Sequence, residues 1–151
     1  MKIQCFHTKE LSIKIAETSN VKRKKRMITK SIQKFGDILP KIDSVKNIDS
    51  KNSILVFVCV EEKDENKNLC QIAQDIWEYK EIVGAEEIVM GAFAHISSTP
   101  AKAEVAIKIL NSLEYETKKI CPETTQYPFG WDKSLDINLY CHPYNVTFKS
   151  Y

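Results

Sequence analysis

The run Ile54-Leu55-Val56-Phe57-Val58-Cys59-Val60 is continuously apolar and rich in β-branched side chains. A run of this kind is typical of a strand that is covered on both faces, as a strand in the middle of a sheet is. We therefore predict that residues 54–60 form the central strand and that the other elements are arranged around it.

Length and composition indicate one domain over residues 1–151. The chain is 43% apolar and 28% charged, and its 4 glycines and 5 prolines do not indicate a long linker. A chain of this size buries roughly two thirds of its unfolded surface. No apolar run approaches the roughly 20 residues of a bilayer span, and the N-terminus has no signal-peptide pattern. We expect a cytoplasmic protein without a membrane partner.

The N-terminal segment has a strand-like alternation. Apolar and polar residues alternate over Lys2–His7, and Leu11, Ile13 and Ile15 then recur at every second position. This pattern predicts two short strands joined near Thr8–Glu10, which would form an opening hairpin.

A basic amphipathic helix is predicted between about Asn20 and Gly36, where the apolar residues with helical spacing are Ile28, Ile32 and Phe35. The predicted helix begins with five consecutive cations, which are Lys22, Arg23, Lys24, Lys25 and Arg26. The net charge of +2 does not by itself indicate a nucleic-acid binder, but such a block can neutralise several phosphates. Two interpretations stay open, namely contact with RNA and a solvated helix face.

Two loops and two more helices follow in the predicted order. Residues 37–52 are predicted to be a surface loop because they contain Pro40 and several Asp, Asn and Ser residues. A polar turn over residues 61–66 precedes a helix ending near Gly84, whose apolar face is Leu69, Ile72, Ala73, Ile76, Trp77 and Val83. Ser98-Thr99-Pro100 is predicted to start another helix, with a hydroxyl cap and an inward stripe of Val105, Ile109, Leu110 and Leu113.

Further strands are predicted over Glu87–Phe93 and around a final alternating set, which is Leu135, Ile137, Leu139 and Cys141. Strands therefore precede, separate and follow the long helices. The fold class predicted from this order is α/β, a single-domain sandwich in which helices pack on a mixed β-sheet. The opening hairpin and the final strand argue against an all-parallel sheet.

The five cysteines are an odd number and have no CxxC spacing, so we predict reduced thiols that are largely buried. A metal site would require the fold to bring together side chains that are distant in sequence, which are His7, His95, Cys141 and His142. We expect no metal. The chain also contains no phosphate-binding glycine loop and no dinucleotide fingerprint, so no cofactor is expected.

Two segments are the best candidates for chemistry. Residues 93–98, Phe-Ala-His-Ile-Ser-Ser, follow a predicted strand and present His95, and residues 127–133 present Lys133 directly after a Pro-Phe-Gly turn. From the residues alone, the structural explanations are favoured, with His95 as a histidine that binds a neighbouring carbonyl, Ser98 as a helix cap and Lys133 as a surface lysine.

Taken in order, several segments resemble the N-terminal editing domain of archaeal threonyl-tRNA synthetase. They are residues 3–7, 57–61, 93–98, 106–110, 128–131 with Lys133, and 141–143. The most specific are F-A-H-I-S-S and P-F-G-W-x-K, and the resemblance covers nearly the whole chain. It implies a fold like that of D-aminoacyl-tRNA deacylases, a homodimer, and metal-independent hydrolysis of serine wrongly attached to threonine tRNA.

The resemblance also implies roles for individual residues. Lys133 would hold the substrate and the attacking water, and His95 would border the aminoacyl group, while the 2′-hydroxyl of the tRNA assists the water. Main-chain groups would line most of the pocket, and its shape would depend on Phe93, Ala94, Phe129 and Gly130, with Asp132 beside Lys133. The adenosine would meet Val60 and Glu61. The cations of residues 22–26 would bind the tRNA acceptor end.

Some positions depart from the family pattern. Asp132 stands where the family usually has Tyr, Val146 where it has a carboxylate, Ala92 where it has Pro, and Cys141 where it has Gly. Residues 20–52 form a longer and more basic insertion, which we interpret as holding the acceptor stem, with the remainder of a synthetase as a further partner. Because the carboxylate is missing, a second hypothesis is that the protein is an inactive relative that binds tRNA or aminoacyl-adenosine without hydrolysing it. A third hypothesis is a cysteine or metal hydrolase.

Overall fold

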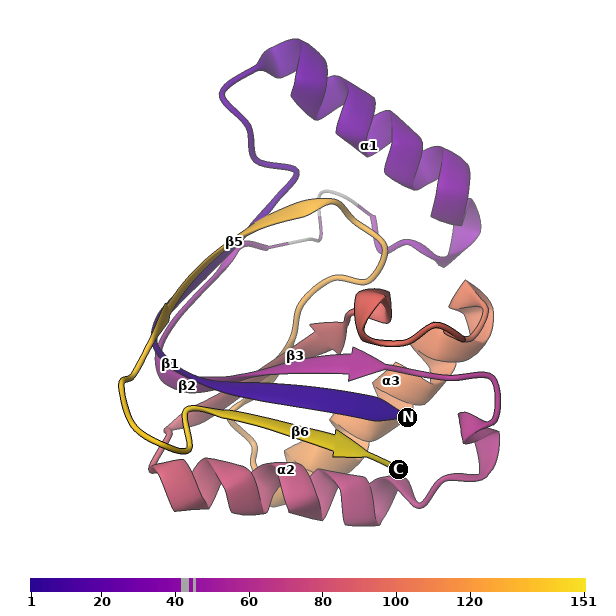
Figure 1. Cartoon of the computed structure of the whole chain (residues 1–151). Helices are drawn as coiled ribbons and strands as arrows, with labels where there is room; N and C mark the ends of the chain where they lie inside the picture. Colours follow the sequence, from indigo (N-terminus) through magenta and orange to yellow (C-terminus); the bar gives the residue numbers. More distant parts are fainter. Residues whose placement is uncertain (42–43, 45) are drawn as a thin grey trace.

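A computed structural model describes residues 1–41, 44 and 46–151 of the chain (Figure 1). Its mixed sheet has the strand order β4-β3-β2-β1-β5, with β6 also paired to β1. The strands are β1 Lys2–Ile15, β2 Ile48–Cys59, β3 Glu87–Ala92, β4 Thr124–Gln126, β5 Lys133–Leu139 and β6 Val146–Ser150. The long helices are α1 Val21–Phe35, α2 Leu69–Val83 and α3 Ala103–Ile120. The predicted α/β sandwich on a mixed sheet is confirmed.

The central position of β2 is also confirmed. It pairs antiparallel with β1 on one side and parallel with β3 on the other. On one face, Ile54, Val56 and Val58 belong to the core beneath the helices, and on the other face Leu55 and Phe57 belong to a second apolar cluster. Because β2 begins at Ile48, the prediction of a loop over all of residues 37–52 is wrong in its last part, and residues 42, 43 and 45 lie outside the described residues.

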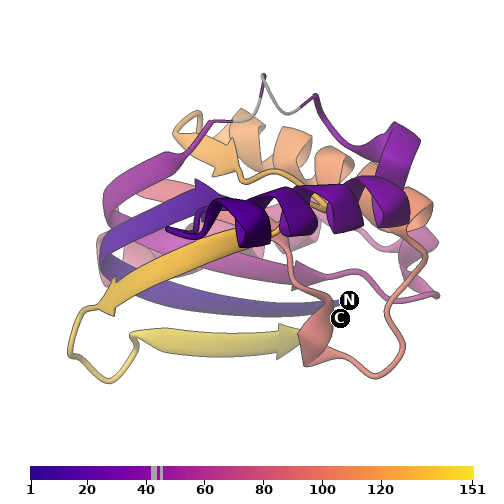
Figure 2. The same cartoon turned by 90° about the horizontal axis from the view of Figure 1, so that it is seen from above.

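The helices α2 and α3 cover one face of the sheet (Figures 1 and 2). The helix α2 begins after Asn68, whose side chain accepts a hydrogen bond from the backbone of Gln71, and it ends at Gly84, as predicted. The predicted start of α3 at Ser98-Thr99-Pro100 is wrong. Pro100 instead pairs with Glu61 in an isolated bridge, so the chain stays extended there and α3 begins at Ala103.

The predicted opening hairpin is wrong, because β1 is one strand of 14 residues. Its pairing with β2 is continuous on both sides of Lys9, but its register with β5 shifts between Thr8 and Glu10. The partner strand has Asn52 at a φ of 47°, a left-handed value that few non-glycine residues adopt. The ribbon of β1 and β2 bends here, and its far half rises toward α1 (Figure 1).

Buried His7 lies at this bend and is hydrogen-bonded on both ring nitrogens. Its Nε2 lies 3.1 Å from Oδ1 of Asn52, and its Nδ1 lies 2.7 Å from Nε2 of His142. The backbone N–H of Tyr144 donates to Nδ1 of His142 at 3.3 Å, so the proton of the neutral His142 ring is on Nε2 and is donated to His7. The pair ties the connection between β5 and β6 to the bend.

The end of the sheet differs from the prediction in two respects. The predicted final strand is present as β5, but it ends at Leu139, so Cys141 lies beyond it. A further strand, β6, follows and is an edge strand whose apolar side chains Val146 and Phe148 are exposed. The cysteines are free thiols, as predicted, but Cys70 and Cys141 are exposed.

The predicted basic helix is confirmed as α1. Asn20 caps it by accepting a hydrogen bond from the backbone N–H of Arg23 at 3.0 Å, and Gly36 ends it. Viewed from above, α1 crosses over the sheet (Figure 2). Within the described residues, none of the helices has the length and apolar character that a membrane span needs.

The bend predicts an effect of His142→Ala on stability. The substitution leaves Nδ1 of buried His7 without its donor, which should lower the free energy of unfolding by about 1–3 kcal/mol. Urea denaturation monitored by circular dichroism measures the difference. The control is His95→Ala, because this side chain is exposed. Equal unfolding midpoints for wild type and His142→Ala would contradict the role of the pair.

Candidate functional site

A cavity of about 420 Å³ lies where the parallel strands β2 and β3 end. The carboxyl ends of parallel strands are a common place for ligands in α/β folds, because the loops there diverge. The cavity is lined by the ends of β2, β3 and α1, by the start of α3 and by the loops next to them. The lining residues are Lys34, Phe35, Val58, Cys59, Val60, Ala92, Ala94, Pro100, Ala101, Lys102, Ala103, Glu104, Ala106, Leu110 and Phe129.

The two segments singled out in the sequence meet at this cavity. Ala94 comes from residues 93–98 and Phe129 from residues 127–133. The second segment turns at Gly130, whose φ of 73° is in the left-handed region and whose missing side chain leaves room for Leu39. The turn presses Phe129 edge-on against Phe35 of α1, with the ring centroids 5.7 Å apart. The helix α1 therefore closes one side of the cavity.

The cavity lining found among the described residues includes neither His95 nor Lys133. His95 is exposed on the short 3-10 turn Ala94–Ile96, next to the cavity residue Ala94. Its ring stands edge-on to Phe93 at a centroid distance of 5.4 Å. Phe93 in turn stacks on Phe57 at a centroid distance of 4.3 Å and packs against the apolar cluster of Phe57, so it ties the turn to that face of the sheet.

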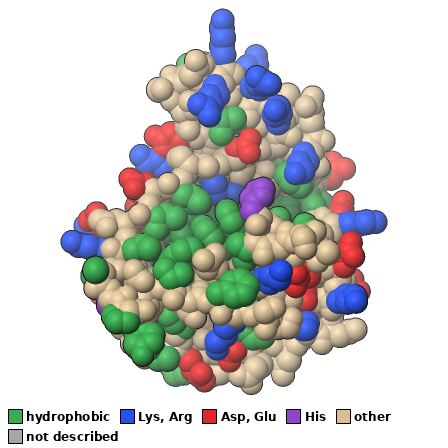
Figure 3. Space-filling model, in the orientation of Figure 1, with side chains coloured by type: hydrophobic (Ala, Val, Ile, Leu, Met, Phe, Trp, Pro, Cys, Tyr) green, Lys and Arg blue, Asp and Glu red, His purple; other side chains and the backbone are tan. Residues whose placement is uncertain are grey.

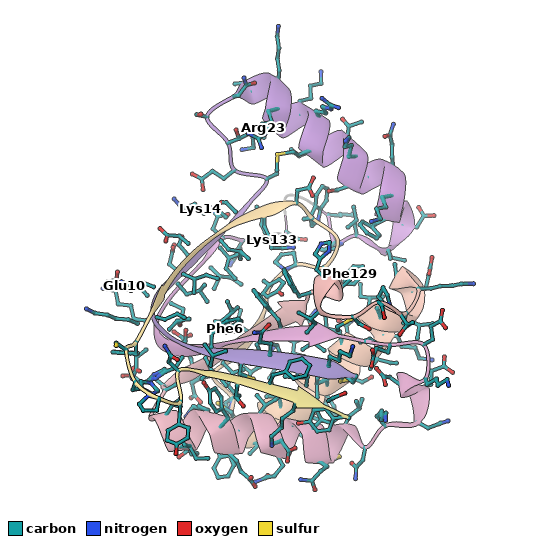
Figure 4. The ribbon with its side chains drawn as sticks, in the orientation of Figure 1. Phe6, Glu10, Lys14, Arg23, Phe129 and Lys133 are labelled. Atoms are coloured by element: carbon teal, nitrogen blue, oxygen red, sulfur yellow. The ribbon has the colours of Figure 1, made fainter. Side chains whose placement is uncertain are left out.

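Lys133 is half-buried at the start of β5, below α1 (Figure 4). Its Nζ donates a hydrogen bond to the backbone oxygen of Trp131 at 2.7 Å and lies 5.2 Å from the centroid of the Tyr127 ring. Burial lowers the pKa of the Lys133 ammonium, and neighbouring Asp132 acts in the opposite direction. Phe57 and Tyr127 belong to one apolar cluster, with Phe93 packed against it, so this cluster links the surroundings of His95 and Lys133.

Tyr127 lies under Lys133 because the sheet leaves space for its ring. A side chain on Gly91 would place its Cβ 2.4 Å from Cε2 of Tyr127, so a glycine is required at this close approach. The Tyr127 hydroxyl donates to the backbone oxygen of Ala92 at 3.1 Å. The ring thus joins the end of β3 to the start of β5.

The other predicted substrate-binding residues have different surroundings. Val60 is buried and lines the cavity. The carboxylate of Glu61 accepts a hydrogen bond from Ser97 at 2.5 Å and lies 3.5 Å from Nζ of Lys2. Asp132 is exposed, and its backbone N–H donates to Oγ of Ser31 at 3.3 Å, which attaches the turn to α1.

The sequence interpretation missed several lining residues. Lys34 and Phe35 at the end of α1 and residues 100–104 before and within the start of α3 line the cavity. Gly36 marked the end of α1, but the sequence contains no signal that this end would lie over β2 and β3. The small residues Ala101 and Ala103 were a local signal of a close approach, but they were assigned to a helix.

The five cations of residues 22–26 are exposed in the first turns of α1. Figure 3 shows Lys and Arg side chains over this helix and a broad apolar area on the face of the sheet below it. Of the four side chains considered for a metal, His7 and His142 meet at the bend. In the described part of the chain, no group of three or more His, Cys, Asp or Glu side chains is placed to hold a metal ion.

Comparison with known proteins identifies relatives of this chain. A family profile described as the archaea-specific editing domain of threonyl-tRNA synthetase matches residues 28–151. The threonine–tRNA ligase editing subunit of Saccharolobus solfataricus is 36% identical over 104 residues, which are 69% of this chain and 27% of that protein. The threonine–tRNA ligase of Hyperthermus butylicus is 31% identical over 75% of this chain and 20% of its own length. The chain thus spans about a quarter or less of these curated relatives.

Solved structures with little sequence similarity share the fold. A c-Myc DNA unwinding element binding protein aligns with a TM-score of 0.67 at 12% identity, over 100% of this chain and 99% of that chain. A probable eukaryotic D-amino acid tRNA deacylase aligns with a TM-score of 0.57 at 6% identity, over 98% and 97%. The expected D-aminoacyl-tRNA deacylase-like fold is confirmed.

Gly91 provides a test of the packing below Lys133. We expect Gly91→Ala to lower the free energy of unfolding by about 1–3 kcal/mol, because the added methyl group displaces the Tyr127 ring. Urea denaturation measures this change. The loss should be smaller in a Tyr127→Leu background, where the ring is absent. An equal loss in both backgrounds would show that the Tyr127 ring is not the obstacle.

Proposed function

This chain belongs to the family of archaea-specific editing domains of threonyl-tRNA synthetase, and on that premise we propose that it is an aminoacyl-tRNA deacylase that hydrolyses seryl-tRNA(Thr). The observation that carries the proposal is the cavity at the ends of β2 and β3, where the Phe-Ala-His-Ile-Ser-Ser and Pro-Phe-Gly-Trp segments meet. Both segments carry the motifs that are the most specific part of the resemblance to the family.

The proposed substrate has a physical reason. The aminoacylation site of a synthetase for threonine can disfavour serine, which is smaller by one methyl group, by only about 1–3 kcal/mol. Selection at that site alone leaves misacylated tRNA. A second site that hydrolyses the smaller ester removes the product of this error, and a cavity lined mainly by small and apolar residues is suited in size to a seryl ester.

In the proposed mechanism, water attacks the ester carbonyl carbon, the bond from this carbon to the ribose oxygen breaks, and the ribose oxygen takes up a proton. The 2′-hydroxyl of the terminal adenosine assists the water. Lys133 holds the ester and the water, turning its ammonium away from Trp131, and His95 borders the aminoacyl group. In the described structure the Lys133 ammonium forms no salt bridge, so no carboxylate has to be displaced first.

The remaining side chains shape the site in this proposal. Backbone groups at Val60, Glu61 and Ala94 meet the adenosine and the ester, and preorganised backbone dipoles stabilise the charge that develops on the carbonyl oxygen. Phe93, Phe129 and Gly130 set the width of the pocket, and Asp132 lies at its margin beside Lys133.

The basic start of α1 is proposed to contact the acceptor stem. The C-terminal end of α1 lines the cavity, while its N-terminal turns carry the exposed cations of residues 22–26. An acceptor end bound in the cavity would therefore bring its phosphates close to these cations. We further propose a cytoplasmic homodimer that acts with the remainder of a threonyl-tRNA synthetase and needs neither metal nor cofactor.

Two departures from the family pattern favour a second function, in which the domain binds aminoacyl-adenosine or tRNA without hydrolysis. Asp132 replaces a tyrosine and Val146 replaces a carboxylate. Val146 lines a separate pocket with Tyr79 and Ile82 and is not in the cavity lining, so of the two departures it is Asp132, beside Lys133, that supports the second function.

Hydrolysis of the esters tests the two functions directly. We expect wild type to deacylate seryl-tRNA(Thr) much faster than threonyl-tRNA(Thr), and Lys133→Met to reduce this rate roughly a hundredfold, because one charge-stabilising donor is removed. Release of radiolabelled serine measures the rate, with excess chelator present. Lys108→Met, which removes an exposed lysine of α3, is the control. Binding of seryl-tRNA(Thr) without faster ester loss would select the second function.

The role of α1 predicts a separate effect on tRNA binding. Replacement of all five cations of residues 22–26 by Gln should weaken binding of tRNA and flatten its dependence on salt, because fewer counterions are released. Hydrolysis of seryl-adenosine, which lacks the stem, should not change. Affinity is measured at several salt concentrations, with Lys63→Gln/Lys108→Gln as the control. An unchanged salt dependence would contradict contact between α1 and phosphates.

A further inference from the structure

The loop that carries His95 is fixed to β2 at both ends. The backbone N–H of Phe93 donates to the oxygen of Val58 at 2.9 Å, and that of Ala101 donates to the oxygen of Val60 at 2.9 Å. Between these anchors the chain forms a wall of the cavity through Ala94 and Pro100. The position of this wall depends on what holds the middle of the loop.

Ser97 holds the middle of the loop. Its hydroxyl donates to Oε1 of Glu61 at 2.5 Å and accepts a hydrogen bond from the backbone N–H of Thr99 at 3.2 Å. Its backbone N–H donates to the oxygen of Ala94 at 3.3 Å, closing the turn that contains His95. One serine thus connects the turn, the following residues and the end of β2.

Glu61 is a firm anchor for this serine. Its backbone N–H donates to Oδ2 of Asp64 at 2.6 Å, and its backbone pairs with Pro100. The hydrogen bond from Ser97 is the largest cause that holds the pKa of the Glu61 carboxyl below its usual value, so the partner of the serine is a carboxylate. A hydrogen bond to a charged acceptor is stronger than one between neutral groups.

We propose that Ser97 and Glu61 form a latch that sets the position of residues 94–97, and that both are positioning residues for the hydrolysis proposed above, on which this inference rests. Glu61 acts through Ser97, since its carboxylate is engaged away from the cavity lining. A displacement of about 1 Å in a group that orients substrate is enough to reduce the rate substantially.

The latch predicts different effects for similar substitutions. Ser97→Ala removes the hydroxyl, and Glu61→Gln keeps the shape of the acceptor but removes its charge. Ser97→Thr keeps the donor. Ser98→Ala is the matched control, because Ser98 is the exposed neighbour in the same loop.

The experiment combines amide hydrogen exchange of residues 93–101 with the rate of seryl-tRNA(Thr) hydrolysis, both on the full chain. We expect Ser97→Ala to exchange about tenfold faster in this loop and to lose about tenfold in kcat, with a smaller change in KM. Glu61→Gln should show an intermediate loss, and Ser97→Thr and Ser98→Ala should match wild type. Circular dichroism confirms that each variant is folded.

The two readouts separate this inference from the proposed function. Unchanged exchange in Ser97→Ala would overturn the latch, and faster exchange with an unchanged hydrolysis rate would overturn the positioning role. Loss of activity in Ser97→Thr equal to that in Ser97→Ala would also overturn it, since the hydroxyl would not be the cause. If wild type hydrolyses neither ester, the deacylase proposal and the positioning role both fail, whereas the exchange data still decide whether the latch exists.

Discussion

The bend of the β1–β2 ribbon is the constraint on which the remaining architecture depends. In a flat ribbon, alternate side chains of each strand would stay on the same face of the sheet along its whole length. At Lys9 and Asn52 the odd-numbered side chains of β1 change face, so Ile3 and Cys5 lie in the core beneath α2 and α3, whereas Leu11 and Ile13 join the cluster of Phe57 on the opposite face. The far half of the ribbon therefore continues the apolar surface upward and carries β5 and α1 with it (Figure 1).

The bend buries polar groups, because the backbone and the imidazole ring of His7 are both removed from water there. The hydrogen bonds to Asn52 and His142 satisfy the ring, and the backbone N–H of His7 donates to the oxygen of Asn145 at 2.8 Å. The same groups fix the connection between β5 and β6. Residues that attract attention as possible metal ligands thus have a structural use in this fold.

Local and periodic features were predictable from the sequence, and features that depend on tertiary pairing were not. The apolar run of β2, and the apolar stripe and terminal Gly84 of α2, lie within single elements. The hairpin was wrong because the polar residues Thr8–Glu10 interrupt the apolar alternation as a turn would, although the pairing with β2 continues across them. The start of α3 was wrong because the pairing of Pro100 with Glu61 overrides a helix-start signal. The edge strand β6 was missed because its apolar residues are exposed. The sequence singled out two segments that meet at the cavity, but it did not indicate that the end of α1 closes the cavity.

The division between the cavity and its surroundings bears on how an editing site can work. The interior is formed by apolar side chains, small residues and strand ends, while His95 is exposed outside the lining and Lys133 rests on Trp131 and Tyr127. In the proposed function, such a lining, whose charged members are Lys34, Lys102 and Glu104, selects an ester by its size and polarity. In the proposed mechanism, discrimination comes from the wall that the Ser97–Glu61 contact holds, and the Lys133 ammonium acts on the ester that this wall admits. The wall belongs to the loop between β3 and α3 and the ammonium to the start of β5, so a substitution can displace one of them without directly displacing the other.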